Sequence, residues 1–343
     1  MWDLRLGFGI WGWLALGIWS LGFVMFYAIR HVTRYRYSRP VWQSIMEARM
    51  HPRTDQAQRC FTFQLSVNPK ARIFSFVDYL GNHVHHFDLP AHHRALTIVA
   101  DALVNLDPPE PLPSALPVEA WDELDRMIHE GDHWPMLLPS HYARPSPQLE
   151  DFARELGLAA RDGRDPLTLL GEVSDAIHGA FEYVKKSTAV NSPIEVSLAS
   201  RQGVCQDFSH IMLAVVRNLG IPCRYVSGYL YHDELHHDRS AEGATHAWVE
   251  ALLPGLGWVG FDPTNGVIAG GRHIRTAVGR DYADVPPTIG TMKGRAETEL
   301  QVRVRVAASQ SLLPPDEELA ADEEWSLFFE SDQQALAWQQ EQQ

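Results

Sequence analysis

The chain has 343 residues, which is enough for two domains that each bury a core of their own. Hydrophobic residues make up 45% of it and charged residues 21%, which is the balance of an ordinary globular protein. The formal net charge of −14 argues against nucleic acid or an anionic membrane surface as a partner.

The N-terminal segment from residue 7 to residue 27 is apolar or small throughout. About 20 such residues suffice to span a bilayer, and no small-residue cleavage site follows. Arg30, Arg34 and Arg36 come next, a bias that keeps the C-terminal side in the cytoplasm. Two interpretations stay open: the segment is a membrane anchor, or Met25 is the true start. Both predict a cytoplasmic globular part, with membrane contact through this segment alone.

Residues 28–105 are rich in strand patterns. Apolar and polar residues alternate in four stretches, at 29–37, 59–67, 71–80 and 82–89. Turn signals separate these stretches, at Asn68-Pro69, Gly81-Asn82 and Pro90. The pattern predicts an antiparallel β-sandwich-like domain.

Residues 106–117 form a proline-rich linker, and helical patterns follow it. The helical stretches lie at 119–130, 147–158 and 165–184, and the later strand patterns at 223–231, 246–253, 257–262 and 299–307. These predict a second part, over 118–307, in which helices pack on an antiparallel sheet. The fold class of the whole chain is therefore α+β. Residues 308–343 are acidic and predict a disordered tail.

Three cysteines, Cys60, Cys205 and Cys223, predict no disulfide framework and suit a reducing compartment. An apolar stripe runs from Phe208 to Leu219 at helical spacing, and Gly220 closes that helix. The helix therefore begins near Cys205, where unpaired N–H groups and the positive end of the dipole favour a thiolate. A buried, inert cysteine is the alternative interpretation.

A hairpin after this helix carries a histidine and an aspartate. Pro254-Gly255 marks its turn, and a hairpin symmetric about residue 254 pairs His246 with Asp262. Both side chains then lie on one face, about 5 Å apart at Cβ, so that the carboxylate can accept from the imidazole. The pattern indicates a nucleophile, a base and an orienting acid: Cys205, His246 and Asp262.

Several separate motifs carry a family resemblance. The sequence resembles bacterial transglutaminase-like proteins over roughly residues 28–307. The motifs are GVCQDFSH, GIPCRYVSGYL, THAWVE, GFDPTNG and GRDYADVPP in the core, and HVTRYRYSRPV and DYLGNHVHHF in the N-terminal region. The resemblance implies a papain-like α+β core and a Cys-His-Asp triad of Cys205, His246 and Asp262. It also implies a transglutaminase or cysteine protease. Cys223 stands where the family pattern leads us to expect alanine.

The chemistry expected of this triad is acyl transfer through a thioester. Cys205 attacks a peptide or glutamine-type amide, and His246 protonates the amine that leaves. Water then completes a hydrolysis, whereas an amine completes a transamidation. The backbone N–H of Cys205 is the first candidate for stabilising the oxyanion, and Gln202 is a weaker one.

Six further residues are candidates for contacts near the site, and four of them have two open roles each. Trp248 and Trp258 share a face with the triad in the expected hairpin, where they either wall a substrate groove or pack in the core. Arg280 and Asp281 either line the substrate side or tie a loop down. The remaining two are Asp207, which we expect to complement the helix dipole, and His210, which we expect on a polar face.

No cofactor or metal is expected. The histidine-rich stretches at 83–93 and 232–237 fit no standard zinc spacing, and no nucleotide-binding motif occurs in a strand-to-helix context. The expected partner is a peptide or protein substrate. The alternative class of function is a non-catalytic peptide-binding module on the same fold. A third interpretation is a membrane-anchored processing factor, which would differ from the enzyme in location and not in chemistry.

Overall fold

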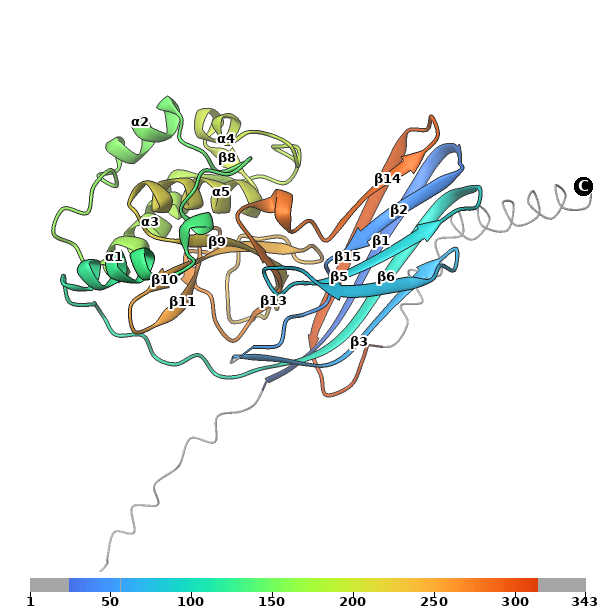
Figure 1. Cartoon of the computed structure of the whole chain (residues 1–343), viewed down its shortest axis with the longest axis horizontal. Coiled ribbons are helices and arrows are strands. Elements are labelled where there is room, and N and C mark those ends of the chain that lie inside the picture. Colours follow the sequence, from blue (N-terminus) through green and yellow to red (C-terminus); the bar gives the residue numbers. More distant parts are fainter. Residues whose placement is uncertain (1–24, 56, 314–343) are drawn as a thin grey trace, which may run out of the picture.

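The computed structural model describes residues 25–55 and 57–313, which form a β-sandwich and an α+β core (Figure 1). Residues 7–24 of the apolar segment and most of the acidic tail lie outside the described residues. Met25–Tyr27, the end of that segment, belong to the first strand. In the described part of the chain, no helix combines the length and apolar character needed to cross a membrane.

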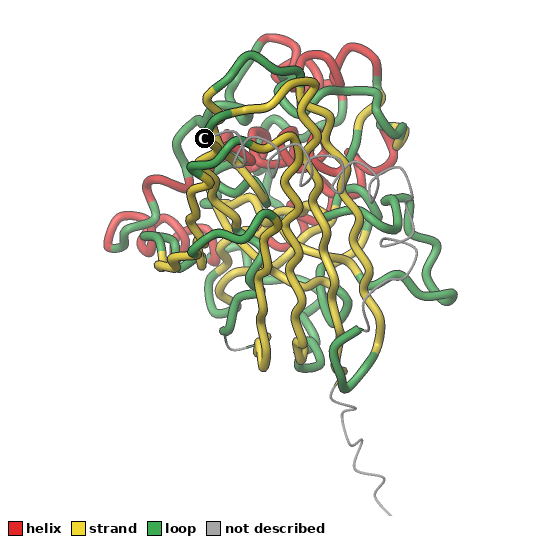
Figure 2. The backbone as a smooth tube through the Cα atoms, turned by 90° about the vertical axis from the view of Figure 1, so that its right-hand side faces the viewer, coloured by secondary structure: helices red, strands yellow, loops and turns green. Residues whose placement is uncertain are grey.

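The sandwich consists of two four-stranded antiparallel sheets, with strand orders β15-β1-β6-β3 and β14-β2-β5-β4 (Figure 2). Their inner faces share one core, to which both sheets contribute large side chains such as Tyr37, Phe87 and Ile98. The strands are β1 Met25–Val41, β2 Gln43–Ala48, β3 Gln58–Asn68, β4 Ile73–Val77, β5 His83–Leu89, β6 His93–Leu106, β14 Thr288–Lys293 and β15 Thr298–Ala308. The predicted α+β class and N-terminal antiparallel sandwich are confirmed.

The last two strands return to the sandwich. Residues 299–307, expected within the 118–307 core, lie in β15 and pair along β1, with Ile29 opposite Val306 and Tyr37 opposite Thr298. Strand β14 pairs with β2 in the same way. Alternation along a strand indicates which face is apolar, but it does not identify the neighbouring strand. The order along the chain was therefore a poor guide to this pairing.

The core places helices on a five-stranded antiparallel sheet of order β12-β11-β10-β9-β13. The helices are α1 Ala120–Glu130, α2 Pro147–Glu155, α3 Pro166–Ala180, α4 Ile194–Ser200 and α5 Cys205–Asn218, with short helices η1 Trp134–Met136 and η2 Tyr282–Asp284. The sheet strands are β9 Cys223–Leu230, β10 His246–Leu253, β11 Gly257–Asp262, β12 Val267–Ile268 and β13 His273–Gly279. A separate parallel pair joins β7 Glu182–Tyr183 to β8 Gln202–Gly203.

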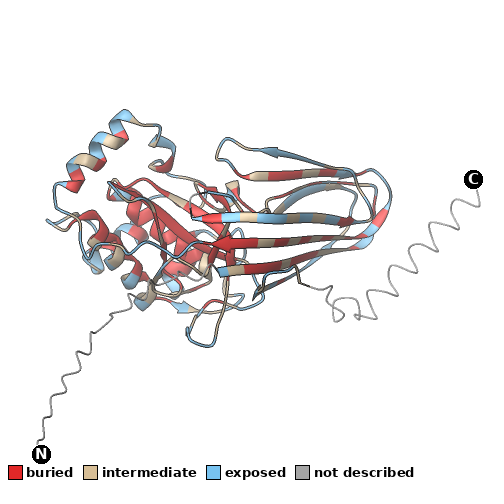
Figure 3. Ribbon diagram, turned by 90° about the horizontal axis from the view of Figure 1, so that it is seen from below, coloured by how far each residue is buried: buried red, intermediate tan, exposed pale blue. Residues whose placement is uncertain are grey.

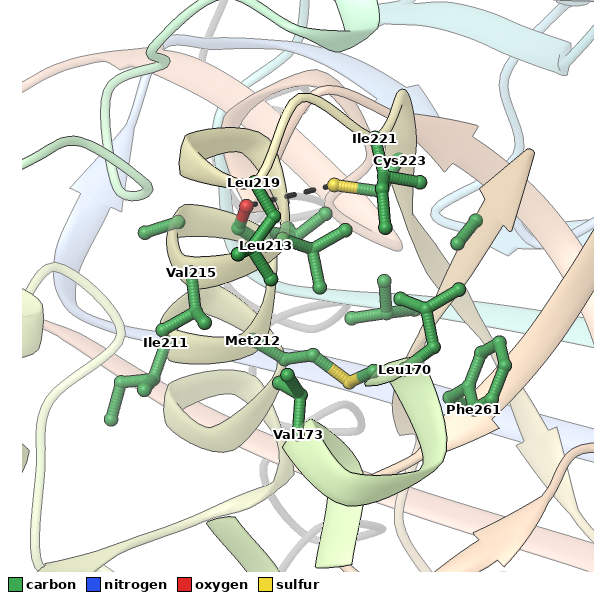
Figure 4. Packing of buried hydrophobic residues seen from close by; sticks show 14 of the residues in the cluster. Leu170, Val173, Ile211, Met212, Leu213, Val215, Leu219, Ile221, Cys223 and Phe261 are labelled. Atoms are coloured by element: carbon green, nitrogen blue, oxygen red, sulfur yellow. Dashed lines mark hydrogen bonds between the residues drawn. The ribbon is translucent and has the colours of Figure 1, made fainter. Parts of the chain in front are cut away.

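Helix α5 is the buried centre of the core. Every residue from Asp207 to Arg217 is buried, and side chains such as Met212 and Leu213 meet Leu170 of α3 and Phe261 of β11 in one cluster (Figure 4). Gly220, with a φ of +78°, follows the helix as the glycine signal predicted. A fixed α5 gives its first residue, Cys205, a fixed position at the end of the sheet.

Cys223 is a buried thiol in the same cluster. Its Sγ donates to the carbonyl of Leu213 at 3.6 Å, and burial raises the pKa of its thiol to about 11 (Figure 4). A thiol that stays protonated and enclosed is a structural residue. Cys223 therefore does not add a second reactive thiol to the cluster that contains the candidate nucleophile, Cys205.

The sandwich closes the outer edge of the core sheet. Strand β13 pairs with β9 on one side, and on the other side two amide side chains bond its backbone. Gln58 donates to the Arg275 carbonyl and accepts from its N–H, both at 2.8 Å. Asn82 forms the same pair of 2.8 Å bonds with Val278. Buried residues therefore run along the strands of both parts and across their junction (Figure 3).

Candidate active site

The start of α5 presents Cys205 at the first helical position. The carboxylate of Asp207 accepts from the N–H of Val204 at 2.8 Å and from the Thr188 hydroxyl at 2.6 Å. Asp207 is thus at the first turn as expected, but its contacts tie the entering chain to the helix. Burial raises the pKa of Asp207, and these hydrogen bonds offset part of that rise. These contacts hold the start of the helix in place beside Cys205.

The Cys205 side chain is half-buried among three tyrosines. Burial raises the pKa of Tyr183, Tyr225 and Tyr282, and their electrostatic interaction with Cys205 raises all three further. The Cys205 N–H meets no backbone or side-chain acceptor in the part of the chain that the structure describes. An unpaired N–H beside the thiol is what an oxyanion would need.

His246 and Asp262 form a short, buried hydrogen bond. Nε2 of His246 lies 2.7 Å from Oδ2 of Asp262, and the two side chains are 3% and 0% exposed. Burial alone would lower the pKa of His246. The Asp262 charge and hydrogen bond, with a smaller contribution from Cys205, outweigh it and raise the pKa to about 10. The imidazole is therefore held as a cation at neutral pH.

The free nitrogen of His246 faces the thiol. Nδ1 is buried and forms no regular hydrogen bond with the described residues. Because Nε2 is engaged by Asp262, the interaction with Cys205 that contributes to the raised pKa falls to Nδ1. This arrangement orders the three groups as thiol, imidazole and carboxylate.

Asp262 accepts five hydrogen bonds. Oδ2 accepts from Nε2 of His246, from Nε2 of His273 at 3.1 Å and from the Asn265 side-chain amide at 2.8 Å. Oδ1 accepts hydrogen bonds from the backbone N–H groups of Thr264 and Asn265, at 3.0 and 3.2 Å. Burial would raise the pKa of Asp262, yet the His246 charge and these donors hold it far below its usual range.

The hairpin that carries the pair is displaced from the expected register. The turn is centred on Gly255, so Leu253 pairs with Gly257 and Val249 with Phe261. Symmetry about residue 254 was wrong because three residues, Pro254, Gly255 and Leu256, connect the paired Leu253 and Gly257, and Gly255 at their middle has a φ of +70°. The partner of each residue moves by two positions, and a shift of two keeps every side chain on its face. His246 and Asp262 therefore still meet, diagonally.

The two tryptophans lie in different places. Trp248 is fully buried, with its ring 6.1 Å from the His246 ring and packed edge-on against His273 at 5.2 Å. Its ring packs directly against Gly228, where an added Cβ would lie 2.6 Å from the indole. Trp258 sits beneath the Arg224 guanidinium, 4.2 Å away, near the turn of the hairpin. Trp248 packs behind the triad, and Trp258 lies at the far end of the hairpin.

The other expected contact residues are engaged locally. Gln202 donates to Glu182 at 3.1 Å on the surface, and Arg280 forms an ion pair with Asp284 at 3.1 Å. Asp281 is buried and accepts from the N–H groups of Tyr142 and Ala283, at 2.7 and 2.9 Å. These contacts tie down the loop that ends with Tyr282.

His210 is buried rather than on a polar face. Its Nε2 accepts from the Tyr282 N–H at 3.2 Å, and its ring stacks on Tyr142. Burial lowers the pKa of His210 to about 3, so the neutral ring can accept this bond. The expectation of a polar face was wrong because α5 is enclosed on all sides, which an apolar stripe on one face does not reveal.

His246, Asp262 and His273 form a group with ligand atoms close enough to hold a metal ion. The fit is poor, because both Nε2 atoms are directed at the same Asp262 oxygen as hydrogen-bond donors. In the histidine-rich loop, His232 and His236 each pair with a separate aspartate. The donor set is that of a hydrogen-bond network.

Two open pockets flank the loop from residue 231 to residue 245. One, of about 370 Å³, is lined by Tyr183, Glu182 and Arg239 among others. The other, of about 300 Å³, lies between this loop and β15, with His232 and Glu242 in its wall. The hydroxyl of Tyr183 accepts from the N–H of Ala241, which ties the first pocket to this loop.

His273 and Asn265 are site residues that the sequence patterns did not indicate. Asn265 follows the Asp262 strand in a tight turn, and His273 opens a different strand. A short strand pattern with one histidine carries no chemical signal. The approach of His273 to Asp262 depends on how β13 is placed in the sheet.

Residues 27–105 match the bacterial transglutaminase-like N-terminal region, and residues 152–263 match the transglutaminase-like superfamily. An uncharacterised protein of Mycobacterium leprae is 33% identical over 277 residues, which are 80% of this chain and 96% of that protein. One from Mycobacterium tuberculosis is 32% identical over 290 residues, covering 80% and 90%.

A protein-glutamine gamma-glutamyltransferase of Pseudomonas aeruginosa is 34% identical over 97 residues, 25% of this chain and 14% of that protein. The crystal structure of a candidate cysteine protease from Cytophaga hutchinsonii shares the fold, with a TM-score of 0.65 and 24% identity over 85% of this chain and 93% of that one. The chain therefore belongs to the transglutaminase-like superfamily, with the bacterial transglutaminase-like N-terminal region ahead of its core.

Proposed function

We propose that this protein catalyses thiol-dependent acyl transfer on peptide or glutamine-type amides. The observation that carries the proposal is the buried His246–Asp262 pair, 2.7 Å apart, set against a cysteine at the start of α5. The pair keeps a proton on the imidazole, and an imidazolium beside a thiol favours the thiolate.

In the first half of the reaction, the Cys205 thiolate attacks the amide carbonyl carbon and forms a carbon–sulfur bond. The carbonyl oxygen takes the negative charge and is placed beside the unpaired Cys205 N–H. The C–N bond then breaks as Nδ1 of His246 gives its proton to the leaving nitrogen. The products are a thioester and ammonia or an amine.

In the second half, neutral His246 accepts a proton from the incoming nucleophile. Water yields a carboxylic acid, and a primary amine yields a new amide; both regenerate the thiolate and the imidazolium. The similarity to a glutamine gamma-glutamyltransferase supports the transamidation outcome, and the likeness to a candidate protease supports the fold alone. Both outcomes use the same three residues.

A partition experiment tests the proposal. The full chain is incubated with a glutamine-containing peptide and a fluorescent primary amine, and ammonia, amine incorporation and peptide cleavage are measured. Incorporation with ammonia release indicates a transferase, ammonia alone an amidase, and new peptide termini a protease. Cys205→Ala should abolish whichever occurs.

Cys60→Ser is the matched control, because Cys60 is a half-buried thiol in the sandwich whose pKa is raised to about 11 by burial. It should retain full activity. Saturable peptide binding with none of the three products, across glutamine peptides of varied sequence, would replace the enzyme by a non-catalytic binding module.

A further inference from the structure

His273 is a second imidazole bound to the catalytic carboxylate. Its Nε2 lies 3.1 Å from Oδ2 of Asp262, the same oxygen that takes Nε2 of His246 at 2.7 Å. His273 comes from β13, the edge strand on the far side of β9, whereas His246 and Asp262 come from the β10–β11 hairpin. Its contact therefore joins the hairpin to a different part of the sheet.

We infer that His273 is a positioning residue, which donates a hydrogen bond to Asp262 and fixes the carboxylate in the orientation that binds His246. The inference rests on the proposed function. It deepens that function by adding a fourth group that acts on the nucleophile through two others.

The tautomer of His273 follows from its second contact. The Gly270 N–H donates to Nδ1 of His273 at 3.3 Å, so Nδ1 is an acceptor and carries no proton. The proton of the neutral ring is therefore on Nε2, the atom that faces Asp262. The backbone N–H of His273 in turn donates to the Gly270 carbonyl at 2.9 Å, which closes a tight turn and fixes the ring relative to its backbone.

The surroundings keep His273 neutral and immobile. Its side chain is 4% exposed, and the Trp248 ring packs edge-on against it at 5.2 Å. Burial lowers the pKa of His273, although Asp262 opposes that effect. A neutral donor can orient the carboxylate without competing with the His246 cation for its charge.

Two substitutions of similar polarity separate this role from packing. In His273→Gln, the amide nitrogen can reach the position of Nε2, whereas the shorter side chain of His273→Asn cannot. The readout is the second-order rate constant for iodoacetamide alkylation of Cys205 between pH 5 and 9, with labelling sites assigned by mass spectrometry. This rate reports the activated thiol without requiring a substrate.

We expect His273→Gln to stay within about threefold of the wild-type rate at pH 6. We expect His273→Asn to lose about tenfold or more, as when a catalytic group is displaced by a fraction of an ångström. His93→Gln, at a buried histidine that contacts Ser44 in the sandwich at 2.8 Å, is the control for losing a buried imidazole and should label at the wild-type rate.

The outcomes distinguish this inference from the function on which it rests. Wild-type rates and pH profiles in both His273 variants would overturn the positioning role while leaving an activated Cys205. Equal losses in both variants would also overturn it, because the ring itself would then be what matters. If wild-type Cys205 labels at pH 6 no faster than a free thiol, the proposed function and the positioning role both fail.

Discussion

The protonation of His246 depends on one carboxylate that is almost completely satisfied by donors. Asp262 is 0% exposed, and an isolated buried carboxylate would take up a proton. Two backbone N–H groups, the Asn265 amide and two imidazoles instead hold it ionised. Its charge then keeps His246 protonated up to about pH 10.

The same pair contributes stability over a defined pH range. The folded-state pKa of His246 is raised, so its contribution is complete below about 6.5 and is lost as the pH rises through about 10. The pKa of Asp262 is depressed, so its contribution is present above about 3.9 and is lost as the pH falls below that value. Both are complete only between these limits, on the acidic side of neutral.

Replacing Asp262 should remove the proton from His246 at neutral pH. In Asp262→Asn the charge is lost while burial remains, so the His246 pKa should fall below its ordinary value of about 6.5. Turnover at pH 7.5 should fall by about 10²–10⁴-fold, the usual range for losing a positioned acid–base group. An NMR titration of the histidine Cε1 protons checks the pKa.

The control for this substitution is Asp233→Asn, which disrupts an exposed carboxylate–imidazole pair with His236 at 2.6 Å. It should leave both the His246 titration and turnover unchanged. A His246 that still titrates near pH 10 in Asp262→Asn would contradict the assignment of the raised pKa to this carboxylate.

Cys205, His246 and Asp262 could be identified from sequence because each lies in a local pattern. The helix stripe places Cys205, and strand alternation places the other two on one face whichever even-numbered shift the turn adopts. His273 and Asn265 could not, since their approach to Asp262 depends on the packing of β13 and on the turn after β11. Local periodicity carries no information on either.

At the level of elements, β13 is the point where the sandwich reaches the site. Its first residue is His273, and its outer edge is bonded by Gln58 from β3 and Asn82 from the turn before β5. An edge strand exposes unpaired N–H and C=O groups, and here two amide side chains satisfy them in place of a sixth strand.

Removing these amides should destabilise the protein and disturb the site. Asn82→Ala leaves the N–H and C=O of Val278 without partners, whereas Gln58→Ala leaves only the N–H of Arg275, because the Arg275 carbonyl still accepts from the Arg53 N–H at 2.9 Å. Each unsatisfied group costs about 1–3 kcal/mol. We expect the urea midpoint to fall in each variant and further in the double variant, with slower Cys205 alkylation as β13 loosens. Urea unfolding followed by tryptophan fluorescence measures the first effect.

Gln64→Ala is the matched control, because Gln64 is an exposed glutamine on the same strand β3. It should change the midpoint little. Urea midpoints in Gln58→Ala and Asn82→Ala equal to that of Gln64→Ala would show that the amide contacts contribute nothing to the junction.

The molecule as a whole is joined by a chain that leaves the sandwich after β6 and returns to it in β14 and β15. Sequence patterns identified strands in both parts but missed β2, β6, β13 and β14, and they placed the returning residues 299–307 in the core. Strand β15 is largely exposed, so no apolar face indicated its partner. The junction also buries polar groups: His31 of β1 contacts the hydroxyl of Tyr229, in β9, at 3.0 Å and Thr33 at 3.2 Å.

This buried histidine predicts acid sensitivity of the junction. Burial lowers the pKa of His31 to about 3, so between pH 6.5 and 3 the unfolded chain binds a proton that the folded chain does not, and stability falls as the pH falls. From pH 7.5 to 5 this costs about 2 kcal/mol. In His31→Gln the loss over that range should be smaller by about this amount, measured by urea unfolding at both pH values. The exposed His237→Gln should lose as much as wild type, and an equal loss in His31→Gln would refute the assignment.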